Sequence, residues 1–305
     1  MPFPVSAAHR QPAVPGRPSG AASSLQRGGG SRRLDSRIER LREAARADRR
    51  LDGVLLYGSW TLGEADDHSD IEAYLFVRDE EEAGFDGPEF VGRLASLKLA
   101  YTNMYGVLAV VFDDLMRGEF PVEAAGPGVA RVATWQGTVH LPDPDAAVLL
   151  DRSGRLTAAA RTLAEHCPPD PLTTAQQLTD ELTNWTLMLA QVLARGETAR
   201  AHALLHTVIA LQQLQLCRLL RGSTVHWPTP SRALEADLPA HDVERYTATT
   251  APARRPDLRI AARRSWQWSR ELAAEAAARW GTVCRAGLHD EIGALLTARD
   301  GGRTA

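Results

Sequence analysis

Residues 51–77 read LDGVLLYGSWTLGEADDHSDIEAYLFV. The pattern predicts a strand, a turn and a second strand, because two apolar runs flank a stretch rich in glycine and acidic residues. The first run ends at Gly58 and Ser59. Gly58 has no Cβ, so its backbone can approach a ligand closely. Ser59 offers a hydroxyl and an N–H at a turn that is predicted to open a short helix, which is a natural seat for an anion.

Two carboxylates begin the second strand. Asp70 and Glu72 flank Ile71 at the start of an apolar run that continues to Val77. Side chains alternate along a strand, so Asp70 and Glu72 are expected on the same face. Neighbouring carboxylates repel each other and lose hydration when buried, so the pair is stable with a cation between them. Paired oxygen ligands suit Mg²⁺ that also holds phosphates, and the sequence therefore predicts a magnesium-nucleotide site here.

Composition limits the class of protein. The chain of 305 residues has a net charge of −3, which argues against a general nucleic-acid binder. Its three cysteines are odd in number and far apart, so they suit a reducing cytoplasm and predict neither a disulfide framework nor a zinc site. No apolar run is expected to span a membrane. These observations predict a cytoplasmic protein with no nucleic-acid or membrane partner.

Three regions differ in their sequence pattern. Residues 1–34 hold five Pro, five Gly and five Arg but no Asp or Glu, which predicts a disordered tail. Residues 35–165 mix helical and strand patterns, which predicts a small mixed sheet with helices packed on one side. Three prolines between Cys167 and Pro171 mark a boundary. Residues 172–300 have helical periodicity and are predicted to form a bundle of about five helices.

The motif in residues 57–72 resembles a known family. Gly-Ser, a spacer of about ten residues and Asp-x-Glu between apolar strands resemble the signature of polymerase β-type nucleotidyltransferases. The fuller string resembles the longer, two-domain lincosamide nucleotidyltransferases, which inactivate lincomycin-type antibiotics, and further matches lie at 111–120, 184–188 and 195–200. The resemblance implies an α+β protein: an N-terminal polymerase β-like nucleotidyltransferase domain with a mixed sheet and helices, followed by a C-terminal α-helical bundle for acceptor binding and dimerisation.

A third carboxylate is expected from the same resemblance. Polymerase β-type folds draw it from a later strand or from the loop beyond that strand. The candidates by position are Asp113, Asp114, Glu119 and Glu123. The resemblance selects Glu119, in the string Arg-Gly-Glu-Phe just past the third predicted strand, and Asp113 is the second choice.

The function that the resemblance implies is transfer of AMP from ATP to a lincosamide sugar hydroxyl, the 3-hydroxyl for the longer type, with release of pyrophosphate. Asp70, Glu72 and Glu119 are the implied Mg²⁺ ligands and catalytic residues, and Glu119 is also the implied general base. Gly58 and Ser59 are the implied nucleotide-binding residues. The partners implied are a nucleoside triphosphate, a small-molecule antibiotic and a second copy of the chain in a homodimer.

Two other functions fit parts of the sequence. An aminoglycoside nucleotidyltransferase would use the same chemistry on another acceptor. Arg200 and His206 match the loose Arg-x4-6-His pattern of HEPN ribonucleases, which suggests a fused toxin–antitoxin protein, although a histidine on a bundle helix more often serves packing. Four tryptophans of the helical region are candidates either for a drug pocket or for the core: Trp185, Trp227, Trp266 and Trp268.

Overall fold

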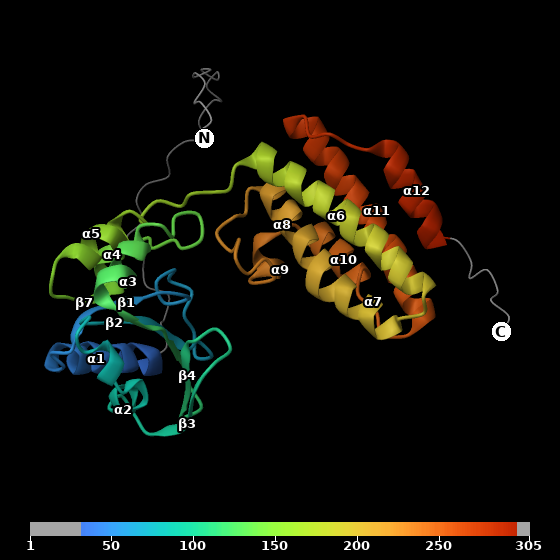
Figure 1. Cartoon of the computed structure of the whole chain (residues 1–305). Coiled ribbons are helices and arrows are strands. Elements are labelled where there is room, and N and C mark those ends of the chain that lie inside the picture. The colour runs from blue at the N-terminus through green and yellow to red at the C-terminus, as the bar shows by residue number, and fades with distance from the viewer. Residues whose placement is uncertain (1–31, 298–305) are drawn as a thin grey trace, which may run out of the picture.

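The computed structural model describes residues 32–297 and has two lobes, one built on a sheet and one made of helices (Figure 1). The sheet lobe comes first in the chain, and a segment over residues 162–170 leads into the helical lobe. This architecture confirms the predicted α+β class, with a mixed sheet followed by a helical region. The predicted tail, as far as residue 31, lies outside the described residues.

The sheet brings distant parts of the sequence together. Its strands are β1 (Leu51–Leu56), β2 (Ile71–Val77), β3 (Leu97–Thr102), β4 (Leu108–Phe112), β5 (Arg117–Phe120), β6 (Val122–Ala124) and β7 (Val148–Asp151). Within the described part of the chain their order is β3-β4-β5-β2-β1-β7, and β6 also pairs with β2. β2 runs antiparallel to β1 but parallel to β5 and β6. The start of β2 therefore lies beside β5, away from both edges of the sheet.

Helices cover both faces of this sheet, and the expectation of helices on one side is wrong. The helices of the lobe are α1 (Arg32–Ala47), the 3₁₀ turn η1 (Glu82–Gly84), α2 (Gly87–Gly92), α3 (Ala125–Val132), α4 (Pro144–Ala147) and α5 (Arg155–Arg161). Leu75 of β2 packs in one core cluster with α1 and α2, whereas its neighbour Phe76 packs in another with α3 and α5. The end of β2 is thus buried on both faces, which a one-sided sheet would not require.

The first helix begins inside the predicted tail. α1 starts at Arg32, and Leu34 is only 1% exposed. Leu34, Ile38 and Leu41 follow the helical repeat and pack into the sheet core. Residues 32–34 therefore belong to the folded lobe, and the predicted boundary at residue 34 is too late. The compositional argument failed there because a single leucine, in register with the helix, is enough to anchor its first turn.

The second lobe is a bundle of helices. Its elements are α6 (Pro171–Ala194), α7 (Thr198–Leu204), the π-helical segment η2 (Leu205–Ile209), α8 (Ala210–Arg221), α9 (Leu234–Asp237), α10 (Ala240–Ala248), α11 (Arg255–Trp280) and α12 (Ala286–Thr297). α6 starts sharply because the Asp170 carboxylate accepts a hydrogen bond from the Thr173 N–H at 2.8 Å and Pro171 occupies the first turn. Asp170 and Pro171 thus mark the point where the linker ends and the bundle begins.

One stretch of the bundle is more apolar than expected. Residues Thr198–Arg221, which include α7, η2 and α8, are long and apolar enough to cross a membrane by length and composition. The expectation that no run approaches such a length is therefore wrong. In the structure 61% of the apolar window is buried, and α8 packs against both α6 and α11. Burial on this scale is what a central helix of a bundle shows, as the sequence predicted for this segment.

Candidate active site

Three carboxylates meet where β2 begins. Asp70 directly precedes β2, Glu72 is its second residue, and Glu119 lies on β5. The two strands are parallel neighbours, and Glu72 stands in direct register with Glu119. The structure therefore brings together the three acidic residues that were expected to hold a metal.

Glu119 lies on a strand of its own rather than just past the third one. The string Arg-Gly-Glu-Phe forms β5, which inserts between β4 and β2. Gly118 makes this insertion possible, because a Cβ there would lie 2.6 Å from the Phe120 ring and 3.1 Å from Ile71. Close packing on the Gly118 face leaves the alternate residue, Glu119, on the face of the carboxylates.

The other acidic candidates have different partners. The Asp114 carboxylate forms ion pairs with Arg33, at 3.0 Å, and with Arg37, at 3.3 Å. Glu123 pairs with Arg131. Burial would raise the pKa of Asp114, but hydrogen bonds and the two arginines lower it below its usual value. Asp114 and Glu123 are thus ion-paired with cations of the scaffold.

The Gly-Ser turn closes over Glu72. Gly58 has φ +77°, and a Cβ at this position would lie 1.6 Å from Glu72 Oε2. Only glycine fits, both for its left-handed backbone and for this close approach. The backbone N–H of Ser59 donates a hydrogen bond to the same carboxylate. The expected short helix does not form in residues 59–63, which are a turn, and the contact that Gly58 permits is with the protein's own carboxylate.

Negative charge accumulates at this site. Burial, followed by the carboxylates of Asp70 and Glu119, raises the pKa of Glu72 to about 7, and Arg232 and the Ser59 N–H lower it by less. Arg117 lies between the other two carboxylates, with N···O distances of 3.6 Å to Asp70 and 3.2 Å to Glu119. An exposed guanidinium therefore occupies the place where a cation is expected.

The donor set suits a hard divalent cation, although the site is not preformed. Among residues 32–297, no three His, Cys, Asp or Glu side chains converge closely enough to hold a metal as they stand. The carboxylates of Asp70, Glu72 and Glu119 are all hard oxygen donors, and a cation would relieve the repulsion that raises the pKa of Glu72. These three residues could hold Mg²⁺ once Arg117 turns away into solvent.

The helical lobe allows a comparison with known proteins. Residues 173–282 match the family model described as lincosamide nucleotidyltransferase-like, C-terminal domain. Most of the helical lobe is thus similar to the C-terminal domain of that family. The match confirms, for this part of the chain, the resemblance seen in the sequence.

Other comparisons are weaker. A crystal structure of an aminoglycoside 6-adenyltransferase from Bacillus subtilis is similar at a TM-score of 0.40 and 11% identity, over 87% of this chain and 98% of that one. An overlap this loose carries no argument about activity or substrate. No curated protein matches the chain significantly.

The helical lobe reaches the carboxylates through a loop. Arg232, in the loop over residues 222–233 between α8 and α9, forms an ion pair with Glu64 at 2.9 Å, and its charge lowers the pKa of Glu72. His226 of the same loop also contacts Glu64, at 2.9 Å. Sequence reasoning missed Arg232 and His226, because a loop has no periodicity that points to a site.

A cavity of about 400 Å³ adjoins the carboxylates in the sheet lobe. Asp70 and Arg117 form part of its wall, and Arg33 and His68 add polar groups that can donate hydrogen bonds. Leu115 lines it with φ +66°, a strained conformation for leucine, and its side chain is 71% exposed. The cavity has the size and polarity to take part of a nucleotide.

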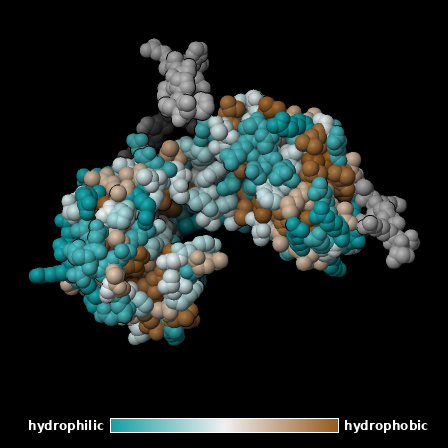
Figure 2. Space-filling model, viewed as in Figure 1, coloured by the Kyte–Doolittle hydropathy of each residue, from teal (hydrophilic) through white to brown (hydrophobic). Residues whose placement is uncertain are grey.

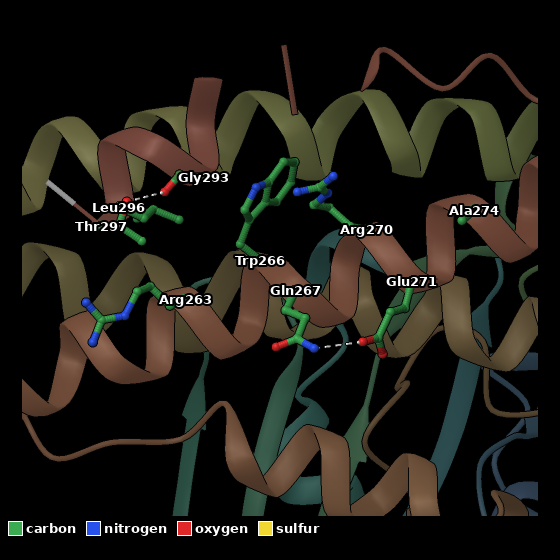
Figure 3. Close-up of a pocket in the computed structure, with 9 residues that line it drawn as sticks. All are labelled: Arg263, Trp266, Gln267, Arg270, Glu271, Ala274, Gly293, Leu296 and Thr297. Atoms are coloured by element: carbon green, nitrogen blue, oxygen red, sulfur yellow. Dashed lines mark hydrogen bonds between the residues drawn. The ribbon is translucent and has the colours of Figure 1, made fainter. Parts of the chain in front are cut away.

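A second cavity lies in the helical lobe (Figure 3). It measures about 410 Å³, and its lining comes from α11 and α12, including Trp266 and Gln267. Figure 1 shows α12 on the side of the bundle away from the sheet. Trp266 and Trp268 are 4% and 2% exposed and belong to the core, and Trp185 and Trp227 pack against it. The tryptophans therefore serve mainly as core.

The residues of the ribonuclease-like pattern have local partners. Arg200 donates to Glu197 at 3.0 Å, three residues earlier in the chain. His206 lies in the π-helical segment, where its ring packs on His202 with a centroid distance of 4.5 Å. Burial, and then His202, lower the pKa of His206. Each residue thus has a structural role in the bundle.

Proposed function

We propose that the protein is an antibiotic nucleotidyltransferase that transfers AMP from ATP to a sugar hydroxyl of a lincosamide, the 3-hydroxyl in the first instance, and releases pyrophosphate. One observation carries the proposal. A half-buried carboxylate with a raised pKa, Glu72, stands beside Asp70 and Glu119 under a Gly-Ser turn, in a chain whose helical lobe resembles the C-terminal domain of lincosamide nucleotidyltransferases. Acidic clusters of this kind are typical of catalytic sites.

The carboxylates bind the metal ion in this proposal. Asp70, Glu72 and Glu119 would hold Mg²⁺, which when bound neutralises charge that develops on the phosphates. Gly58 and Ser59 would seat the triphosphate: the turn has no side chain at residue 58, and the Ser59 N–H is available once its bond to Glu72 is released. Arg117 is then free to pair with phosphate oxygens, because its carboxylate partners are otherwise engaged.

Glu119 acts as the general base. Its side chain is 32% exposed, so an acceptor can reach it from solvent. As the acceptor oxygen attacks the α-phosphorus, the hydroxyl proton passes to the Glu119 carboxylate. The bond from the α-phosphorus to the bridging oxygen breaks, and pyrophosphate leaves. Figure 2 shows the surface hollowed between the two lobes, and we place the drug there, with the helical lobe as one wall.

The proposed homodimer has a candidate contact surface. β3 is an edge strand, and Leu99 and Tyr101 on it are about half exposed. Met104 and Tyr105, in the hairpin that follows, are 88% and 81% exposed. A second copy of the chain would cover these apolar side chains. Light scattering during gel filtration measures whether the protein is a dimer. The cytoplasmic location also stays a prediction.

A substrate panel tests the proposed function. Lincomycin, clindamycin and kanamycin are each incubated with ATP and Mg²⁺, and the products are analysed by mass spectrometry, with the Asp70→Asn variant as control. We expect an AMP adduct on the lincosamides only, and NMR of the product identifies the modified hydroxyl. An adduct on kanamycin alone would instead support the aminoglycoside enzyme. No adduct and no pyrophosphate with any acceptor would overturn the proposal.

A further inference from the structure

The turn that carries the nucleotide residues touches the helical lobe at one acidic side chain. Residues 58–70 form this motif turn, which joins the end of β1 to the start of β2. Glu64, at its tip, contacts His226, which lies 162 residues later in the chain. Its two oxygens face His226 Nε2 at 2.9 and 3.0 Å, and one of them pairs with Arg232 at 2.9 Å.

The helical side of this contact is rigidly mounted. Arg218 is fully buried, and its guanidinium donates to the carbonyl oxygens of Pro230, at 2.7 Å, and of Arg232 itself. It also forms an ion pair with Asp237 at 2.7 Å. Together with bonds to the carbonyl and hydroxyl oxygens of Ser223, these bonds hold the 222–233 loop at both ends. A buried group of the bundle thus fixes the backbone from which the Arg232 side chain projects.

His226 links the two lobes. Its Nδ1 faces Asp237 at 2.6 Å while its Nε2 faces Glu64, and its side chain is 6% exposed. Burial would raise the pKa of Asp237, but hydrogen bonds from Arg218 and His226 lower it below its usual value. The ring of His226 thus lies between a carboxylate of each lobe. Hydrogen bonds to carboxylates are charge-assisted and about twice as strong as bonds between neutral groups.

The motif turn is anchored in the sheet lobe by Trp60, whose Nε1 donates to Asp35 of α1 at 2.9 Å, and Trp60 and Ala65 pack against the sheet core. Thr61 donates to the Gly58 carbonyl, and Ser69 and Asp66 bond to each other, all within the turn itself. A Cβ added at Gly63 would meet no other atom within 4 Å. The bonds of Thr61, Asp66 and Ser69 hold the turn's shape, and Glu64 ties its tip to the helical lobe.

We infer that Glu64, Arg232 and His226 are positioning residues: through them the helical lobe holds the motif turn, and with it Gly58 and Ser59, in the geometry that the nucleotide requires. The inference deepens the proposed function and rests on it. It means that the helical lobe is part of the ATP site as well as a wall for the acceptor. Arg232 acts on the nucleotide through Glu64 and not by direct contact.

The experiment is a double-mutant cycle with Glu64→Gln and Arg232→Gln in the full chain. Each single variant should raise KM for Mg-ATP about tenfold, the loss expected for one charge-assisted hydrogen bond, with kcat changed less than about twofold. The double variant should be no worse than either single one, because both changes break the same contact. Arg232→Lys should restore part of the affinity.

A matched control is the exposed pair Asp145 and Arg161 of the sheet lobe, whose atoms lie 3.0 Å apart. Asp145→Asn and Arg161→Gln should leave KM and kcat unchanged. If the effects of Glu64→Gln and Arg232→Gln multiply in the double variant, Arg232 contacts the nucleotide directly and the inference is wrong.

Amide hydrogen exchange separates this inference from the proposed function. Without nucleotide, peptides that cover residues 58–70 should exchange about tenfold faster in the Glu64→Gln and Arg232→Gln variants than in the wild type. Unchanged exchange would overturn the inference even in an active enzyme. Faster exchange in a protein that transfers no nucleotide would support the interlobe contact while the proposed function fails.

Discussion

The two lobes contribute to the candidate site in different ways. The sheet lobe supplies Asp70, Glu72 and Glu119 from strands, where alternation and register place them side by side. The helical lobe supplies Arg232 and His226 from an irregular loop, whose shape depends on buried contacts of the bundle. Regular strands thus fix the acidic groups, while a loop on a rigid helical scaffold brings Arg232 and His226.

The sharpest test of this division is to neutralise the strand carboxylates. Asp70→Asn and Glu72→Gln should reduce AMP transfer below detection, because each removes a proposed metal ligand. The fold should survive, since relieving repulsion between carboxylates rarely destabilises a protein. Pyrophosphate release measures the activity, and circular dichroism verifies the fold. Turnover near the wild-type rate in either variant would show that the metal site was assigned to the wrong residues.

The base on the neighbouring strand should matter next most. Glu119→Gln keeps the size of the side chain and removes the proton acceptor, so we expect kcat to fall by about two to four orders of magnitude. Nucleotide affinity should change little, and the acid limb of the pH profile of kcat should flatten.

Asp113→Asn is the matched control for Glu119→Gln and should stay active. If Asp113→Asn is inactive while Glu119→Gln turns over normally, the third carboxylate is Asp113. If Glu119→Gln binds Mg-ATP poorly and recovers with more metal, Glu119 serves chiefly as a ligand.

Sequence patterns predicted the site residues on the strands much better than those in the loop. Alternation placed Asp70 and Glu72 on one face, and the family resemblance selected Glu119, but neither revealed that β5 pairs directly with β2. That pairing depends on Gly118, whose role is visible only once its neighbours are known. The contact between Glu64 and the 222–233 loop depends on how two lobes pack, and no local spacing encodes it.

The raised pKa of Glu72 has a consequence for stability. A carboxyl group whose pKa is higher in the folded state opposes folding once it is ionised. The resulting loss of folding stability is absent below the ordinary pKa of the group, 4.5. It grows as pH rises and is complete above about pH 7. Without divalent metal, Glu72→Gln should therefore leave stability unchanged at pH 4 and increase it at pH 8, by at most about 3 kcal/mol.

Urea unfolding at the two pH values measures this difference. Glu43→Gln, on the exposed side of α1, is the control and should show no pH-dependent gain. Equal stability of Glu72→Gln and wild type at pH 8 would mean that the site tolerates the charge, and the argument for a cation at this position would lose its electrostatic basis.

The smallest effect is expected at the outer cavity of the helical lobe. Arg263→Ala and Gln267→Ala remove two exposed side chains from its α11 wall. The acceptor hydroxyl must come within about 3.5 Å of the phosphorus that it attacks. A drug bound between α11 and α12, on the side away from the sheet, cannot meet that requirement. KM for lincomycin and kcat should therefore change less than about twofold, within the range of a neutral surface substitution. A tenfold rise in KM for lincomycin, with KM for ATP unchanged, would place the drug in this cavity, and the acceptor would then have to reach the carboxylates of a partner molecule.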